Sequence, residues 1–73
     1  MNFLYQIVTS VFVYTLYEED GHIFLHVLNL RTEETSDIFG IPKIMDILSE
    51  DTEVSFKDLI EVDDIITTVL VSN

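Results

Sequence analysis

Cysteine is absent from this sequence of 73 residues. A chain without cysteine has no disulfide, no thiolate zinc site and no thiol nucleophile. Glycine occurs only twice, which excludes a glycine-rich loop that cradles phosphate groups. Basic residues number three, Arg31, Lys43 and Lys57, and so few cannot neutralise several phosphates of a nucleic acid. The composition therefore excludes a disulfide scaffold and argues against direct binding of DNA or RNA.

The first 17 residues contain no charged side chain, but they match neither a signal peptide nor a membrane helix. Polar residues interrupt the segment at Asn2, Gln6, Thr9, Ser10 and Thr15. No basic residue precedes it and acidic residues follow it, whereas positive charge usually flanks such segments. We therefore expect a protein without a membrane segment, located in the cytoplasm of the source or host cell.

Acidic residues are by far the most numerous charged residues in the sequence. Asp and Glu number 14 and the formal net charge is −11, yet 48% of the residues are hydrophobic. A disordered acidic tail would lack the hydrophobic residues that offset the entropy of ordering, so we expect a single folded domain over residues 1–73. Self-repulsion destabilises a compact protein with so much charge of one sign. A basic partner is the simplest reason to tolerate that cost.

The first half of the chain predicts a β-hairpin. Residues 3–17 are rich in β-branched and aromatic types, which favour a strand, and residues 22–30 form a second such run. Asp20 and Gly21 between them suit the positive φ angles of a two-residue turn. This turn pairs Glu19 with His22, Tyr17 with Phe24, Thr15 with His26, Val13 with Leu28 and Val11 with Leu30. Both hairpin faces are largely apolar, so helices are expected on one face, and a homodimer is a candidate cover for the other.

Helix signals begin after a polar connection over residues 31–37. Pro42 is suitably placed at a helix start, and apolar residues follow it at helical spacing. Ser55 and Asp58 form a variant of the capping box, which predicts the start of a second short helix. A strand over residues 54–56 is the alternative at that place.

The C-terminal residues predict a closing strand. Asp63 and Asp64 are expected to end the second helix, and residues 65–71 are mainly β-branched. The expected fold class is therefore α+β, a small single domain. Its N-terminal hairpin and C-terminal strand form a three-stranded antiparallel sheet packed by one or two short helices.

No arrangement of residues indicates catalysis, a metal or a cofactor. His22 and His26 are spaced to share an ion on a helix, but on a strand they lie about 13 Å apart. Asp63 and Asp64 are explained more simply as a solvated helix end than as metal ligands. The chain also lacks a recognisable Ser/His/Asp context. We expect a binding protein rather than an enzyme.

The acidic residues have the right sign to imitate a nucleic acid. Double-stranded DNA carries one charge per about 1.7 Å of its axis, and its binding proteins offer Lys and Arg to the phosphates. On a helix, Asp46 with Glu50 and Asp58 with Glu61 would lie about 5 to 6 Å apart, a phosphate-like separation. The predicted partner-binding residues are Glu18, Glu19, Asp20, Asp46, Glu50, Asp51, Glu53, Asp58, Glu61, Asp63 and Asp64. The expected partner is a basic protein, most simply a nucleic-acid-binding enzyme or complex.

In size, charge and lack of catalytic motifs, the chain resembles the small acidic inhibitors that viruses and mobile elements encode against host nucleic-acid enzymes. The resemblance is one of composition, and it assigns no role to any individual residue. Immunity proteins and antitoxins of basic toxins have the same composition. The competing interpretation is an acidic structural or oligomerisation domain, a homodimer whose charge serves solubility.

Overall fold

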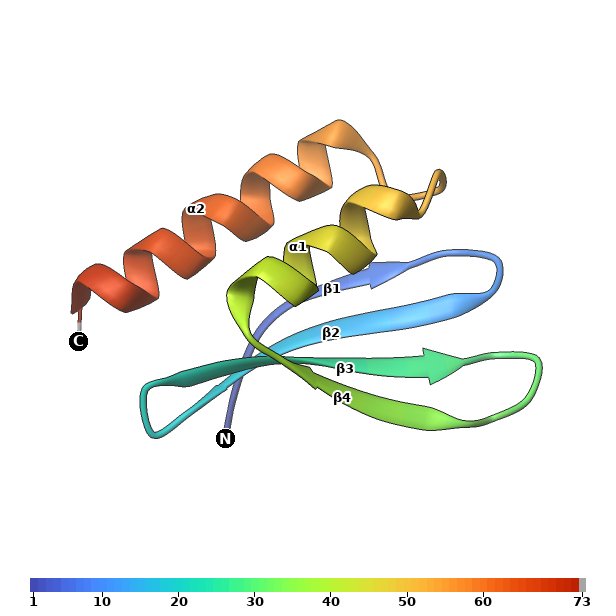
Figure 1. The fold of residues 1–73 in the computed structure, drawn as a ribbon, viewed down its shortest axis with the longest axis horizontal. Helices are drawn as coiled ribbons and strands as arrows, with labels where there is room; N and C mark the ends of the chain where they lie inside the picture. The colour runs from blue at the N-terminus through green and yellow to red at the C-terminus, as the bar shows by residue number, and fades with distance from the viewer. Residues whose placement is uncertain (73) are drawn as a thin grey trace.

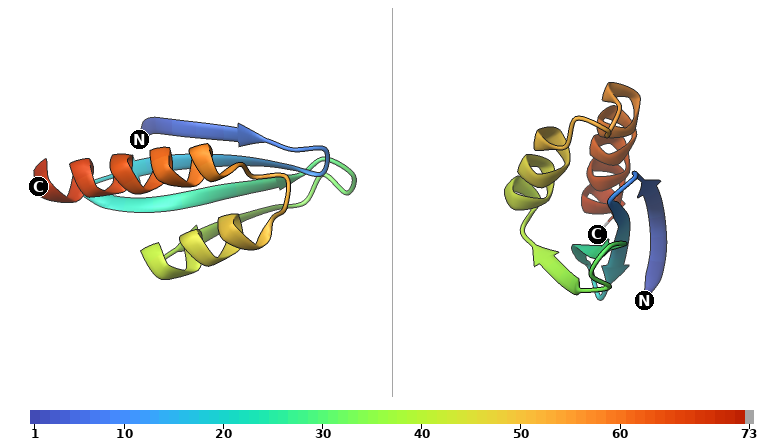
Figure 2. Two further views of the ribbon diagram at one scale, coloured as in Figure 1. Left: turned by 90° about the horizontal axis from the view of Figure 1, so that it is seen from above. Right: turned by 90° about the vertical axis from the view of Figure 1, so that its right-hand side faces the viewer.

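The computed structural model describes residues 1–72 and shows four strands followed by two helices. The strands form one antiparallel sheet in the order β1-β2-β3-β4, and both helices lie on the same side of it (Figures 1 and 2). The elements are β1 (Asn2–Val8), β2 (Phe12–Glu19), β3 (His22–Asn29), β4 (Thr35–Phe39), α1 (Ile41–Glu50) and α2 (Phe56–Ser72). The molecule is a small α+β fold of two layers, with one face of the sheet covered by helices and the other open.

The predicted strand over residues 3–17 is in fact two strands, because the chain turns at Thr9. The Thr9 hydroxyl accepts hydrogen bonds from the backbone N–H groups of Val11 (3.2 Å) and Phe12 (2.9 Å). The Thr9 backbone N–H in turn donates to the Phe12 carbonyl over 2.8 Å. A hydroxyl that bonds the backbone just ahead of it closes a turn without glycine. This turn was not predicted because Thr9, Val11 and Phe12 are also good strand formers and the turn contains no glycine or proline.

The hairpin of β2 and β3 is confirmed. Its register pairs Glu19 with His22, Tyr17 with Phe24, Thr15 with His26 and Val13 with Leu28. Asp20 has φ 52° and Gly21 has φ 81°, the positive angles that the two-residue turn requires. This local signal was sufficient because turn geometry fixes the register of a hairpin.

The predicted polar connection over residues 31–37 contains the beginning of β4, so the prediction of a three-stranded sheet is wrong. The Asn29 side-chain oxygen accepts hydrogen bonds from the N–H groups of Arg31 (2.9 Å) and Thr32 (3.2 Å), and Glu33 has φ 64°. These features reverse the chain, and β4 then pairs antiparallel with β3. The strand escaped prediction because most of its residues are polar and lie at an exposed edge.

Both predicted helix starts are confirmed. Pro42 lies in the first turn of α1, where its missing N–H group has no helical partner to lose. The Ser55 hydroxyl accepts a hydrogen bond from the Asp58 N–H over 3.1 Å and caps α2, which excludes a strand at residues 54–56. Neither helix within residues 1–72 is long and apolar enough to cross a membrane.

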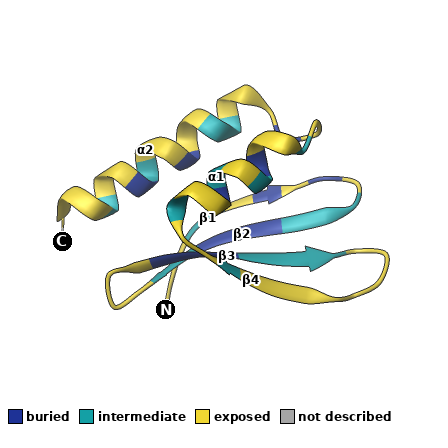
Figure 3. Ribbon diagram, viewed as in Figure 1, coloured by how far each residue is buried: buried dark blue, intermediate teal, exposed yellow. Residues whose placement is uncertain are grey.

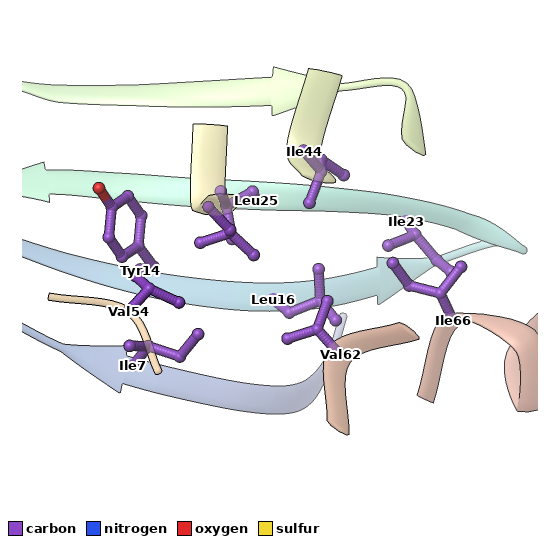
Figure 4. Close-up of a cluster of buried hydrophobic side chains, with 10 residues drawn as sticks. Ile7, Tyr14, Leu16, Ile23, Leu25, Ile44, Val54, Val62 and Ile66 are labelled. Carbon is purple, nitrogen blue, oxygen red and sulfur yellow. The ribbon is translucent and has the colours of Figure 1, made fainter. Parts of the chain in front are cut away.

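The predicted C-terminal strand over residues 65–71 is wrong, because α2 continues past Asp63 and Asp64 to Ser72. Val62 and Ile66, four residues apart, are buried, whereas both aspartates are exposed. Figure 4 shows Val62 and Ile66 pointing from α2 towards side chains of the sheet. Burial of this helical stripe outweighs the preference of β-branched residues for strands, since packing routinely overrides intrinsic propensity.

The hydrophobic core lies between the sheet and the two helices (Figures 3 and 4). Its members come from both layers and comprise Ile7, Tyr14, Leu16, Ile23, Leu25, Ile44, Leu48, Val54, Val62 and Ile66. Leu16 and Leu25 are paired on adjacent strands, and each is only 1% exposed. The inner face of the sheet is therefore fully used by the fold, and any site for a partner must lie elsewhere.

Candidate functional site

The acidic residues predicted to bind a partner lie in two separate parts of the fold. Glu18, Glu19 and Asp20 stand at the end of β2 and in the turn that follows. The others belong to the helical layer: Asp46 and Glu50 on α1, Asp51 and Glu53 in the connection, and Asp58, Glu61, Asp63 and Asp64 on α2. The molecule is elongated, with extents of 36 × 24 × 18 Å, and Figure 1 shows the β2–β3 turn and the α1–α2 connection at opposite ends. The predicted residues therefore do not form one continuous surface.

Most of the negative charge is left without a positive partner in the fold. Among residues 1–72, the contact that could be ionic joins His26 Nδ1 to Asp37 Oδ1 over 2.7 Å, and it is an ion pair only when the imidazole is protonated. Arg31, Lys43 and Lys57 form no ion pair within that range. The carboxylates are therefore available to an external cation unless a hydroxyl or an N–H group holds them.

Asp58 is one carboxylate that the fold itself uses. The Tyr5 hydroxyl of β1 donates a hydrogen bond to Asp58 Oδ1 over 2.7 Å, joining residues 53 positions apart. This bond, then burial, raises the pKa of Tyr5 to about 12. The same bond is the main cause of a pKa of Asp58 below its ordinary value of 3.8. Asp58 thus attaches the beginning of α2 to β1.

Asp51 attaches the α1–α2 connection to strand β2, and Glu53 attaches it to the β1–β2 turn. The Tyr14 hydroxyl donates to Asp51 Oδ2 over 2.5 Å, and burial together with this bond holds the pKa of Tyr14 well above its ordinary value. Glu53 accepts two hydrogen bonds from Ser10, one from its hydroxyl (2.6 Å) and one from its N–H group (3.1 Å). Three predicted partner-binding residues, Asp51, Glu53 and Asp58, therefore have structural roles that the sequence did not reveal.

Five acidic residues of the helical layer remain, and we refer to them as the helical acidic surface: Asp46, Glu50, Glu61, Asp63 and Asp64. All five are exposed, and their carboxylates make no hydrogen bond or ion pair within residues 1–72. Asp46 and Glu50 are four apart on α1, as predicted, which places them about 5 to 6 Å apart on one face. The pair of Asp58 and Glu61 has the predicted helical spacing too, but Asp58 is turned towards Tyr5.

At the other end of the molecule, Glu18 is also held by the fold. It accepts hydrogen bonds from the Gly21 N–H (3.0 Å) and from the Asn2 side-chain amide (2.9 Å). The bond from Gly21, followed by that from Asn2, lowers the pKa of Glu18. Glu19 and Asp20 are exposed at the tip of the hairpin. This end therefore offers two free carboxylates, fewer than the helical layer.

The open face of the sheet carries a row of four aromatic rings, one from each strand: Phe3, Tyr17, Phe24 and Phe39. Successive ring centroids lie 6.4, 5.4 and 5.5 Å apart. The outer rings of Phe3 and Phe39 are each 61% exposed, while Phe24 is only 8% exposed because its neighbours cover it. The sequence analysis missed this row because the row needs the registers of β1 and β4, and neither was predicted as a separate strand.

The two histidines lie beside the aromatic row, in a hollow of about 800 Å³ near the β2–β3 turn. Glu19, Asp20 and Asp37 also line it, as does Leu70 of α2. Within residues 1–72, no group of three or more His, Asp or Glu side chains is arranged to hold a metal ion. His22 and His26 both lie on the open face of β3 with Phe24 between them, and the His26 imidazole contacts the Asp37 carboxylate.

Comparison with protein-family models, with curated proteins and with solved structures finds no match for this chain.

Proposed function

We propose that this protein binds a basic partner protein stoichiometrically through the helical acidic surface, and that it acts as a binding protein rather than as an enzyme. The observation that supports the proposal is that these five carboxylates are exposed on two adjacent helices and have no cationic partner within residues 1–72. A fold that needed them for its own stability would pair them, as it does with Asp58 and Tyr5.

The partner we propose is a nucleic-acid-binding enzyme or complex, which the protein inhibits by occupying the DNA or RNA site. Such a site presents Lys and Arg at the spacing of phosphates, and helical carboxylates four residues apart match that spacing to within a few ångströms. A net charge of −11 also steers the protein towards a basic surface and accelerates association by about 10- to 1000-fold. We place this interaction in the cytoplasm of the source or host cell. A basic toxin bound by an immunity protein or antitoxin would use the same surface and the same chemistry.

The test compares two variants of equal charge. The helical variant carries Asp46→Asn, Glu50→Gln, Asp63→Asn and Asp64→Asn. The control variant carries Glu19→Gln, Asp20→Asn, Glu33→Gln and Glu34→Gln, all exposed positions that belong to neither helix. Each variant loses four of the 14 acidic charges, so both change the net charge from −11 to −7.

Tagged wild-type protein is first used to capture partners from lysate of the source and host cells at about 0.1 M salt, followed by elution with rising salt. The expected result is one basic nucleic-acid enzyme that cannot bind its DNA or RNA while captured. The helical variant should bind that enzyme at least about tenfold more weakly than wild type. The control variant should stay within about threefold of wild type. Equal weakening by both variants, or recovery of no basic partner, would contradict the proposal.

A further inference from the structure

β1 forms one edge of the sheet, and its outer side is open. Within residues 1–72 it pairs with β2 alone, and Figure 2 shows neither helix beyond it. An edge strand presents unpaired N–H and C=O groups, which are a template for pairing with another strand. Proteins usually protect such edges with charged residues, proline or a very short strand. β1 has seven residues and no charged residue, histidine or proline, although a bulge at Leu4 is present near its start.

The two edges of the sheet differ in charge. The opposite edge, β4, has five residues including Asp37, and Glu33 and Glu34 directly precede it. β1 instead carries exposed apolar side chains on the open face, with Phe3 61% and Val8 65% exposed. In a molecule of charge −11, β1 is therefore the edge whose own side chains carry no charge. The carboxylates of Glu18 and Asp58 lie beside it and accept hydrogen bonds from Asn2 and Tyr5 of β1.

We propose that two copies of this chain associate through β1, edge to edge and antiparallel, to form an eight-stranded sheet. A second copy is the favoured occupant because its own β1 is uncharged and equally open. Pairing β1 with the β4 edge of another copy would instead bring Asp37 into the contact and would leave free edges for further copies. Pairing of β1 with β1 is self-complementary and closes as a two-fold dimer. The proposal is independent of the basic partner discussed above, since β1 contains none of the acidic residues.

The alternation of side chains between the two faces limits the registers in which β1 can pair with the β1 of a second copy. Tyr5 and Ile7 face the helices, as their pairing with Leu16 and Tyr14 shows, whereas Gln6 and Val8 are on the open face. Antiparallel pairing keeps each face continuous only if residues of the same face lie opposite each other. Of the registers that do this, we choose the one centred on residues 5–7, the regular part of β1 after the bulge, which places Gln6 opposite the partner's Gln6 and Tyr5 opposite the partner's Ile7. A two-fold axis through Gln6 leaves both helical layers on the same side of the sheet.

The dimer is expected to be concentration-dependent. Seven residues span about 23 Å, so the contact is smaller than a standard interface of about 800 Å² per partner. Two copies also bring together a charge of twice −11, or −22. Screening of this repulsion means that salt should strengthen the association.

The first test measures self-association by sedimentation equilibrium from micromolar to near-millimolar concentration at about 1 M salt. Gln6 suits substitution because it is exposed and, within the described part of the chain, its side chain bonds Thr15 alone, over 3.1 Å. Gln6→Lys changes the net charge to −10 and Gln6→Glu changes it to −12. Because the net charge changes in opposite directions, a weakening that both variants share comes from the local contact and not from the overall charge. Both should weaken dimerisation at least about tenfold, because each places like charges opposite each other at the two-fold axis. Val8→Lys, at another exposed position, gives a second variant if Gln6 proves intolerant.

The second test uses the absence of cysteine, which makes any introduced thiol unique. Gln6→Cys should form a disulfide-linked dimer on mild oxidation at least about tenfold faster than Thr35→Cys, an exposed open-face position on the β4 edge. Circular dichroism of each variant verifies that the fold is intact. A wild-type protein that stays monomeric throughout the concentration range overturns the proposal. So does a dimer whose strength is unchanged by both Gln6 charges, or one that cross-links equally through Thr35→Cys.

Discussion

Two tyrosine hydroxyls join the sheet to the helical part of the chain. Tyr5 of β1 donates to Asp58, and Tyr14 of β2 donates to Asp51. Hydrogen bonds to charged acceptors are stronger than neutral ones, and they contribute about 1.5 to 3 kcal/mol where water is excluded. These two bonds use carboxylates that composition alone would assign to a partner.

The bond between Tyr5 and Asp58 predicts a pH-dependent difference between wild type and Tyr5→Phe. The pKa of Tyr5 is raised from 10.0 to about 12, so its contribution to folding is complete below pH 10 and is lost as the pH rises towards 12. The pKa of Asp58 is lowered from 3.8, so its contribution is present above that pH and is lost as the pH falls through the lower, folded-state value. Urea unfolding should show Tyr5→Phe less stable than wild type by about 1 to 2 kcal/mol near pH 7. This difference should shrink above pH 10 and again in acid.

The matched control for this measurement is Tyr17→Phe. The Tyr17 hydroxyl makes no hydrogen bond within residues 1–72, and its ring stays in the aromatic row after the change. We expect Tyr17→Phe to follow wild type across the whole pH range. A Tyr5→Phe difference that is constant with pH would mean that Asp58 does not sense the Tyr5 hydroxyl.

Among the elements, α2 is the one whose type depends on packing rather than on local preference. Its C-terminal half is β-branched, and two hydroxyls in that half bond backbone carbonyls one turn earlier, Thr68 to Asp64 and Ser72 to Thr68, each over 2.8 Å. Such bonds are compatible with a helix but do not stabilise it strongly. The helix is held by the buried stripe that includes Val62 and Ile66.

The effect of substitutions in α2 should follow a helical period. Ile66→Ala removes a side chain that is 3% exposed and should destabilise the protein by about 2 to 4 kcal/mol. Thr67→Ala changes an exposed neighbour and should alter stability by less than about 0.5 kcal/mol. Asp64→Ala, two positions before Ile66, separates the two secondary structures. It is exposed on the helix but would share a face with Ile66 on a strand. Thermal or urea unfolding measures all three, and a cost for Asp64→Ala equal to that of Ile66→Ala would contradict the helix.

Local chemistry allowed parts of this fold to be predicted from the sequence. The turn at Asp20 and Gly21 and the helix starts at Pro42 and Ser55 depend on residues within a few positions of one another. The remaining elements depend on contacts between distant residues. β4 becomes a strand through its pairing with β3, and the second half of α2 becomes a helix through burial against the sheet.

The candidate site was predictable to a similar extent. Composition identified an acidic surface, and helical periodicity identified Asp46 and Glu50 as neighbours. Neither composition nor periodicity could separate free carboxylates from those that accept hydrogen bonds within the fold, because the hydroxyl donors are far away in the sequence. Ser10 and Glu53 are 43 positions apart, and Tyr5 and Asp58 are 53 apart. The edge position of β1 was likewise hidden, since it depends on the turn at Thr9.

At the scale of the whole molecule, charge is segregated. Five free carboxylates lie in the helical layer and two lie at the tip of the β2–β3 hairpin, whereas β1 at the edge of the sheet has no charged side chain. The two proposed interactions should therefore respond to salt in opposite directions. Raising salt from about 0.1 M to 1 M shortens the screening length from about 10 Å to about 3 Å.

We expect this change to weaken binding of the basic partner by at least about tenfold and to strengthen dimerisation. Fluorescence titration with the captured enzyme and sedimentation of the protein alone, both in the same salt series, measure the two effects. Parallel responses to salt would show that a single surface serves both interactions. That outcome would contradict the division of the molecule into a charged layer and an uncharged edge.

The order of the strands has a consequence for how the protein folds. Each strand pairs with its neighbour in the chain, so the sheet forms by closing short loops, which costs little entropy and is fast. α2 is different, because its attachment to β1 spans most of the sequence. Docking of this helix closes the longest loop in the molecule. We therefore expect the arrival of α2, rather than assembly of the sheet, to limit the rate at which the native state is reached.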